Sequence, residues 1–142
     1  MEAQSIAKAT QAFWKDQFAT QVTGARIEQV AHEYAECSLI LTPRHCNAAG
    51  NVMGGVLFTL ADLAFAVAAN NEIIDTVASD QLWMSLDSTI HYLRRTKGKK
   101  LIATAQCIKS GQSISLYEIK ITDDNNQLIA TIETTGIRST KK

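Results

Sequence analysis

The chain has 142 residues, and its 14 lysines and arginines balance its 14 aspartates and glutamates, so the formal net charge is zero. This length predicts one domain with a single core, spanning residues 1–142. Zero net charge argues against a broad basic surface, so we expect neither nucleic acid nor membrane as a partner. Cys37, Cys46 and Cys107 lack the spacing of metal ligands and predict free thiols in a reducing compartment, without a metal site.

The N-terminal segment, MEAQSIAKATQAFWKDQF, places apolar residues at helical spacing and lacks the apolar core of a signal peptide. We expect an amphipathic helix over residues 1–20 and a cytoplasmic location. Two apolar stretches follow within ARIEQVAHEYAECSLILT and predict a short antiparallel strand pair with a break at HEY. The next segment, PRHCNAAGNVMGG, contains the only proline of the chain and predicts a long loop.

Residues 54–71 form a long apolar run, which predicts a central helix that is hydrophobic nearly all round. Four strand-like stretches follow at 81–93, 100–108, 113–122 and 127–137, joined by the polar segments RRTKGK, KSGQ and DDNN. Such short segments typically join antiparallel neighbours, so we expect a meander after the helix. The order of elements predicts an α+β domain in which a curved antiparallel sheet wraps around the central helix.

One carboxylate, Asp62, interrupts the apolar helix, where the expected burial would make an unpartnered charge costly. At 100° per residue, Thr59, Asp62, Ala66 and Asn70 share a narrow stripe headed by Gly55. A small or polar stripe leaves room for a slender ligand or for a second helix. Two interpretations stay open here: Asp62 is a structural residue bonded to a neighbour, or it is a functional carboxylate.

The Gly54–Gly55 pair opens the helix, where free backbone N–H groups and the positive end of the helix dipole favour negative charge on an oxygen. Asp62 lies eight residues after Gly54. This separation is about 12 Å along the helix axis, too far for both groups to act on one carbonyl. If they act together, two copies of the helix must pack antiparallel. The spacing therefore predicts a homodimer with two shared sites.

The pattern N-x-x-G-x-x-x-G-G-x-x-F-x-L-A-D-x-A-x-A-x-A-x-N runs from Asn47 to Asn70. It resembles the hotdog-fold acyl-CoA thioesterases of the phenylacetic-acid-degradation (PaaI-like) type, in the 4-hydroxybenzoyl-CoA thioesterase superfamily. A looser similarity extends from about Val22 to Arg138. The resemblance implies a hotdog fold, a curved antiparallel sheet around a long central helix, with the N-terminal helix as an addition.

For catalysis, the resemblance implies that Asp62 is the catalytic carboxylate, that the Gly54 N–H binds the thioester carbonyl, and that Asn47 positions water or substrate. The implied reaction is hydrolysis of an aryl or fatty acyl-CoA, with Asp62 as general base or as nucleophile. Coenzyme A is then part of the substrate, and no separate cofactor is expected. We expect a homodimer or, by further pairing of sheets, a tetramer.

The chain departs from the family pattern at two positions. Many relatives have a histidine before the glycine pair, where this chain has Met53, and many end the third strand with Arg-Pro, where it has Arg94–Arg95. The cations of RRTKGKK suit the phosphates of coenzyme A, or they form a solvated turn that discourages edge pairing. The expected substrate-binding residues are Met53, Gly55, Phe58, Thr59, Arg94 and Lys97.

His45 lies in the loop before Gly54 and is a further candidate base, whereas His32 and His91 lie in strand-like runs typical of structural histidines. Two alternatives to a thioesterase remain. A hotdog hydratase or dehydratase relies on a histidine paired with the carboxylate, and the central helix contains no histidine. A non-catalytic acyl-CoA-binding module would bind thioesters saturably without releasing thiol.

Overall fold

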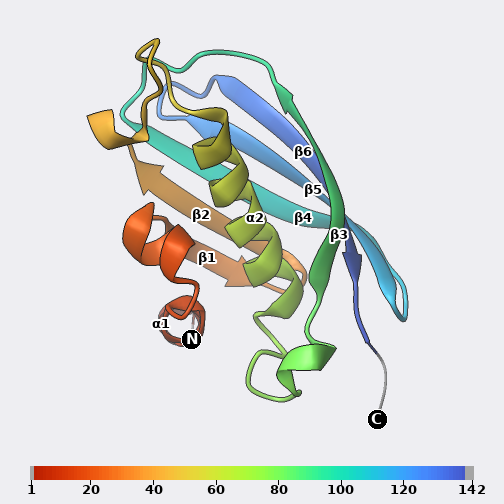
Figure 1. Cartoon of the computed structure of the whole chain (residues 1–142). Coiled ribbons are helices and arrows are strands. Elements are labelled where there is room, and N and C mark those ends of the chain that lie inside the picture. The colour runs from red at the N-terminus through yellow and green to blue at the C-terminus, as the bar shows by residue number, and fades with distance from the viewer. Residues whose placement is uncertain (1, 140–142) are drawn as a thin grey trace.

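The computed structural model describes residues 2–139 (Figure 1). Its helices are α1 (Glu2–Phe13) and α2 (Gly54–Asn70), with the short helical turns η1 (Phe18–Val22), η2 (Pro43–His45) and η3 (Ser79–Gln81). Its strands are β1 (Arg26–Ala31), β2 (Tyr34–Ile40), β3 (Met84–Tyr92), β4 (Lys100–Ser110), β5 (Ile114–Asp123) and β6 (Leu128–Ile137). The order of helices and strands along the chain is the one predicted.

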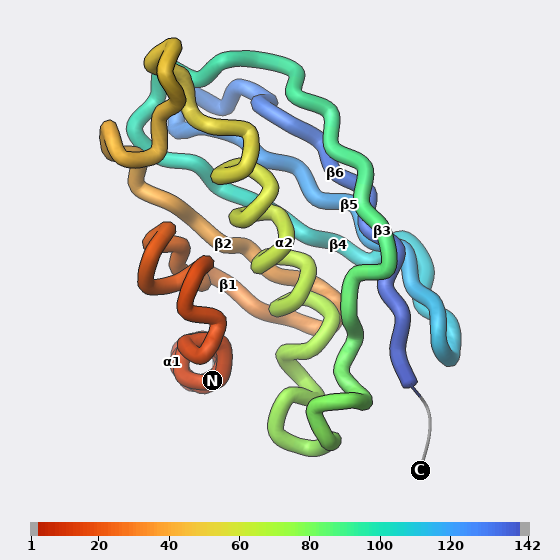
Figure 2. Tube along the Cα trace, in the orientation of Figure 1, coloured from red at the N-terminus to blue at the C-terminus, as the bar shows by residue number. Residues whose placement is uncertain are grey.

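The strands form one antiparallel sheet in the order β1-β2-β4-β5-β6-β3. The sheet curves, and α2 lies across its concave face, as the tube in Figure 2 also shows. The predicted α+β architecture, a hotdog fold with an additional N-terminal helix, is therefore confirmed. The predicted break at HEY is confirmed as well, because His32 and Glu33 form the turn between β1 and β2, with Glu33 at a positive φ of 52°.

The predicted meander was wrong in one connection. β4, β5 and β6 follow one another as a meander, but β3 pairs with β6 at the edge of the sheet and makes no pairing with β4. The place beside β4 is taken by β2, in a register that runs from Tyr34↔Gln106 to Ile40↔Lys100. The segment RRTKGK is therefore no hairpin turn, and it crosses the end of the sheet (Figure 2).

The N-terminal helix is shorter than the predicted range of 1–20. α1 ends at Phe13, and a turn leads into η1, a single turn of π-helix. The Thr20 hydroxyl donates to the carbonyl of Asp16 over 2.7 Å, and the Gln21 side-chain amide donates to the carbonyl of Trp14 over 3.1 Å; these two bonds close the turn. α1 packs against β1 and η1 contacts α2, so the segment lies beside the central helix (Figure 1).

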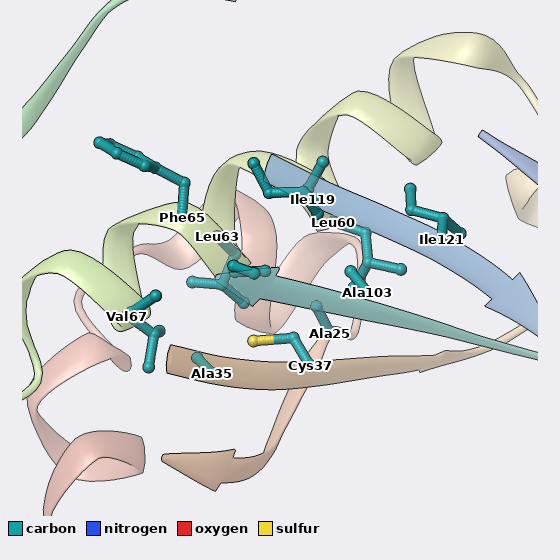
Figure 3. Packing of buried hydrophobic residues seen from close by; sticks show 14 of the residues in the cluster. Ala25, Ala35, Cys37, Leu60, Leu63, Phe65, Val67, Ala103, Ile119 and Ile121 are labelled. Carbon is teal, nitrogen blue, oxygen red and sulfur yellow. The ribbon is translucent and has the colours of Figure 1, made fainter. Parts of the chain in front are cut away.

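The hydrophobic core lies between α2 and the concave face of the sheet (Figure 3). The rings of Phe65, on α2, and Tyr117, on β5, meet edge to face with centroids 5.3 Å apart. Small side chains on the middle strands let the helix approach the sheet closely. The buried inward residues of these strands include Ala35, Cys37, Leu39, Ala103, Ala105, Ile119 and Ile121.

Asn70 joins the end of α2 to the start of β3. It is buried, its Nδ2 donates to the Trp83 carbonyl (3.0 Å), and its Oδ1 accepts from the Trp83 N–H (2.8 Å). The expectation that Asn70 shares an open polar stripe with Asp62 was therefore wrong, because this pairing draws its side chain toward the chain that enters β3. Both backbone groups of Trp83 gain a partner in this way.

Replacing Asn70 with alanine is expected to lower the free energy of unfolding by about 2–4 kcal/mol, because both backbone groups of Trp83 lose a buried partner. Denaturant unfolding followed by tryptophan fluorescence measures this change. Asn125→Ala, at an exposed position between β5 and β6, is the control and should change stability by less than about 0.5 kcal/mol. If Asn70→Ala lowers the free energy of unfolding no more than the control does, the role assigned to the Asn70–Trp83 hydrogen bonds is contradicted.

Candidate active site

The first turn of α2 presents backbone donors. Met53 is the residue before the helix, with an extended backbone (φ −64°, ψ 136°), and its side chain makes no capping hydrogen bond. Within residues 2–139, no acceptor faces the N–H groups of Gly54 and Gly55. The start of α2 therefore offers two N–H groups and the positive end of the helix dipole to an oxygen that gains negative charge.

Gly54 is in close contact with Tyr92 at the end of β3. A Cβ at position 54 would lie 3.1 Å from each of three atoms of the tyrosine side chain. The Tyr92 hydroxyl donates to the Gly54 carbonyl over 3.4 Å. Glycine thus allows the tyrosine ring to pack on the first turn of α2. We did not predict Tyr92, whose one signal in the sequence is its place just before the basic segment.

A pocket of about 410 Å³ opens beside Gly54, between α2 and the connection that follows β3. Val52, Leu57 and Ile129 contribute apolar surface, and Arg94 and Arg95 contribute charge. The same two arginines, together with Lys97, line an adjoining cleft of about 340 Å³. The structure therefore brings together three of the predicted residues, Gly54, Arg94 and Lys97, around two neighbouring hollows.

Two aspartates at the end of β5 hold the basic segment 94–99 in place. The Thr96 hydroxyl donates to Asp123 Oδ2 (2.7 Å), and the Lys99 N–H donates to Asp124 Oδ1 (3.1 Å). Desolvation opposes the charge of Asp123, but hydrogen bonds from Thr96 and from two backbone N–H groups, with the charge of Arg94, hold its pKa below the usual value. These contacts fix the backbone while the cationic side chains remain exposed.

Asn47 organises the loop that leads to α2. Its Oδ1 accepts hydrogen bonds from the N–H groups of Ala49 (3.0 Å) and Asn51 (3.1 Å), and its own N–H donates to the Asn51 carbonyl (2.8 Å). An isolated antiparallel β-bridge between the backbones of Cys46 and Val52 closes the loop. Asn47 is exposed and does not line the pocket beside Gly54. The structure thus shows this residue as a support of the loop before Gly54.

His45, the further candidate base, is engaged at both ring nitrogens. Its Nδ1 accepts from the Thr42 N–H (3.0 Å), and its Nε2 lies 2.8 Å from the Thr23 carbonyl, to which it donates. The His45 carbonyl accepts from the N–H of Met53 (2.9 Å). Both bonds are satisfied by the neutral ring with its proton on Nε2. The histidine therefore ties the chain before β1 to the loop before α2, a structural role.

Asp62 lies in the middle of α2, on the side away from the sheet, and is exposed in the single chain. The prediction of a buried carboxylate was therefore wrong for one chain, because the sheet covers the other side of the helix. Gly55, Thr59 and Ala66 share this side and are exposed or half-buried. The Thr59 hydroxyl donates to the Gly55 carbonyl (2.8 Å). The predicted stripe exists without Asn70.

The pKa of the Asp62 carboxyl is raised above its usual value. Partial desolvation by the surrounding chain is the larger cause, and the negative charge of Asp16, in the turn between α1 and η1, adds to it. A raised pKa makes a carboxylate a stronger base near neutral pH. The raised pKa makes Asp62 a candidate functional carboxylate. We did not predict Asp16, whose electrostatic effect on Asp62 arises from tertiary packing.

One chain does not bring the Gly54 N–H and the Asp62 carboxylate together. The helix separates them by about 12 Å along its axis, and Asp62 does not line the pocket beside Gly54. The predicted substrate contacts Met53, Gly55, Phe58 and Thr59 also lie outside the lining of that pocket. A single chain therefore carries the parts of a site without assembling them.

Within residues 2–139, no three histidine, cysteine, aspartate or glutamate side chains are arranged to hold a metal ion. Burial raises the pKa of the Cys107 thiol to about 11, which disfavours thiolate chemistry near neutral pH. None of the helices in this range has the length and apolar character needed to cross a membrane.

Comparison with known proteins gives consistent matches. The sequence matches the model of the thioesterase superfamily over residues 49–130. It is 30% identical over 120 residues to the acyl-coenzyme A thioesterase PaaI of Escherichia coli (strain K12), covering 84% of this chain and 81% of that protein.

Solved structures give the same result for the fold. The E. coli PaaI protein from the phenylacetic acid degradation operon has a TM-score of 0.83 at 24% identity, covering 98% of this chain and 96% of that chain. A hypothetical thioesterase protein from Streptococcus pneumoniae TIGR4, solved with coenzyme A, has a TM-score of 0.76 at 19% identity. The match covers 89% of this chain and 96% of that chain. The region matched by the family model contains the glycine pair that begins α2 and the carboxylate in its middle. The chain therefore belongs to the thioesterase superfamily, as a PaaI-like member with the hotdog fold.

Proposed function

We propose that this protein hydrolyses acyl-CoA thioesters to a free acid and coenzyme A. Family membership supports thioester hydrolysis, and the relative named acyl-coenzyme A thioesterase supports coenzyme A as the thiol. The observation that carries the proposal is that α2 combines two groups. Its start presents the N–H of Gly54 without an acceptor, and its middle presents the lone carboxylate of Asp62 with a raised pKa.

In the proposed reaction, the thioester oxygen accepts a hydrogen bond from the Gly54 N–H, and the dipole of α2 stabilises the charge that develops on this oxygen. Asp62 either takes a proton from the attacking water or attacks the carbonyl carbon to give an anhydride. The C–S bond breaks as the tetrahedral intermediate collapses, and in the second route water then hydrolyses the anhydride. Asn47 supports the loop before Gly54 and, through its amide nitrogen, positions water or substrate.

The proposed site needs two copies of the chain. If α2 packs antiparallel on its counterpart, Asp62 of one protomer approaches the Gly54 N–H of the other, and two equivalent sites form. The uncovered side of α2 supports this arrangement. The edge strand β3 supports it too, because among the described strands it pairs only with β6 and exposes Met84, Leu86 and the following Leu93. A second copy would cover both surfaces. Further pairing into a tetramer is compatible with this dimer.

Arg94, Arg95 and Lys97 form the proposed binding surface for the phosphates of coenzyme A. The two arginines line both the pocket beside Gly54 and the cleft next to it. A coenzyme A chain that enters through the cleft can thus bring its thioester to the Gly54 N–H while its phosphates contact guanidinium and ammonium groups. The remaining proposed substrate contacts, along the uncovered side of α2, are Met53, Gly55, Phe58 and Thr59.

Asp62→Asn is expected to lower kcat/KM by on the order of 10²-fold or more, because an amide can neither accept the proton nor form the anhydride. The measurement is thiol release from short, medium, long-chain and aryl acyl-CoAs. Asp80→Asn, the same change at an exposed position in η3, is the matched control and should keep kcat/KM within about twofold.

Two outcomes would overturn parts of this proposal. Saturable binding of acyl-CoA without thiol release by the wild type would favour the non-catalytic binding module. Full activity of a folded Asp62→Asn variant would remove this residue from the mechanism.

Thioesters of N-acetylcysteamine, which lack the nucleotide, should be poorer substrates than the matching acyl-CoAs if the basic segment binds phosphates.

Gly54→Pro removes the N–H assigned to the thioester oxygen and places proline at the first helical position, where helices tolerate it. Met53 already has the extended backbone that suits a residue before proline. We expect kcat/KM to fall by on the order of 10²-fold, the usual cost of losing one such donor. Gly54→Ala adds bulk against Tyr92 but keeps the N–H, so it is the matched control and should retain more activity.

Mixed dimers of the Asp62→Asn and Gly54→Pro chains test whether the site is shared between protomers. In such a dimer one site carries both defects and the other carries neither. Dimers purified through two different affinity tags should therefore recover about half of the wild-type activity. If the mixed dimers stay as inactive as the two parents, both groups act within one protomer and the shared site is disproved.

A further inference from the structure

The first turn of α2 is held only weakly by its own residues. It begins with Gly54 and Gly55, and glycine is unfavourable inside a helix because its backbone loses the most freedom there. The side chain of Met53, the residue before the helix, makes no capping hydrogen bond. The turn that carries the proposed donor, the Gly54 N–H, therefore gains from a contact outside the helix.

Tyr92 supplies such a contact from the sheet. It pairs with Ala130 on β6 at the end of β3. The N–H groups of the next two residues, Leu93 and Arg94, both donate to the Ile129 carbonyl, over 2.9 and 3.2 Å. The backbone of the tyrosine is therefore fixed by β6, independently of the loop that leads to α2.

The side chain of Tyr92 contacts two parts of Gly54. A Cβ at position 54 would lie 3.1 Å from Cε1, from Cζ and from the hydroxyl oxygen of the tyrosine, so the edge of the ring lies against the glycine Cα. The hydroxyl donates to the Gly54 carbonyl over 3.4 Å, a long hydrogen bond, so the ring makes the closer contact. Both residues line the same pocket. The tyrosine thus restrains the Cα and the carbonyl of Gly54, and within residues 2–139 the N–H keeps no acceptor.

We propose that Tyr92 is a positioning residue of the active site, whose ring packs on the first turn of α2 and holds the Gly54 N–H in the orientation that the thioester oxygen needs. This inference rests on the proposed thioesterase function. A donor stabilises the charge of the transition state best when it is already aimed at the oxygen. Misplacement by about 1 Å can lower a rate by as much as about 10²-fold. Loss of the ring should therefore affect the transition state more than substrate binding.

The first test compares Tyr92→Leu with Tyr92→Phe in thiol release from the best acyl-CoA substrate. Leucine lacks the three atoms that face Gly54, whereas phenylalanine loses only the hydroxyl. Tyr92→Leu should lower kcat on the order of tenfold with KM within about twofold of wild type. Tyr92→Phe should keep kcat within about threefold. Tyr34→Leu, the same change at a residue that lines a different hollow, is the matched control and should keep the wild-type kcat.

Three results of this comparison would overturn the inference. If folded Tyr92→Leu keeps both constants, the ring has no role in the reaction. A higher KM at unchanged kcat would make Tyr92 a substrate-binding residue that does not orient the donor. Equal losses of kcat in Tyr92→Phe and Tyr92→Leu would assign the effect to the hydroxyl.

A double-mutant cycle tests the contact without relying on activity. Gly54→Ala adds a Cβ against the ring in the wild type, and Tyr92→Leu removes the atoms that this Cβ meets. Gly54→Ala should therefore be less harmful to stability in the Tyr92→Leu background than in the wild type, in denaturant unfolding at equal protein concentration. Gly55→Ala is the matched control, because its Cβ would meet only the end of the Met53 side chain, at an ordinary 3.5 Å. It should have the same effect in both backgrounds.

The two tests separate the failure of this inference from that of the proposed function. If the wild type releases thiol while Tyr92→Leu keeps its kcat, the function stands and the inference is overturned. Additive effects of Gly54→Ala and Tyr92→Leu on stability would overturn it as well. If the wild type releases no thiol, the proposed function fails, and the cycle alone decides whether the tyrosine holds the first turn of α2.

Discussion

The packing of α2 against a sheet that covers only one of its sides determines much of the rest of the structure. The helix is apolar nearly all round, and the concave face of the sheet buries the side that includes Leu60, Leu63 and Phe65. Within residues 2–139, the side from Gly55 to Ala66 is left open. In the proposed dimer, a second copy of the chain would cover this open side. The same side carries Asp62, the carboxylate proposed for catalysis, so the proposed assembly and catalysis would use one surface.

The position of β3 explains how residues far apart in the sequence meet at the start of α2. β2 pairs with β4, so the strand that follows α2 adds at the far edge of the sheet, beside β6. The connection back to β4 then crosses the end of the sheet and carries Arg94 and Lys97 past the helix. Tyr92, at the end of β3, reaches the carbonyl of Gly54. This strand order thus brings a backbone donor, an aromatic ring and a basic segment together.

The sequence predicted what depends on local pattern. The helix expected over 54–71 and all six strands formed, because hydrophobic periodicity and polar turns act over a few residues. The partner of β3 was missed because strand order depends on competition between distant segments. Asp62 stood out by its residue type within an apolar helix, but periodicity could not say whether its own chain would cover that side. Asp16 and Tyr92 were missed because only tertiary packing brings them to α2.

The chain before β1 influences the proposed site at two points that the motif from Asn47 to Asn70 does not contain. The Thr23 carbonyl accepts from His45, whose own carbonyl holds the backbone of Met53 at the start of α2. The charge of Asp16 acts on the carboxylate in the middle of the same helix. Chains that share the motif can therefore differ in the surroundings of the carboxylate proposed for catalysis without any change in the motif itself.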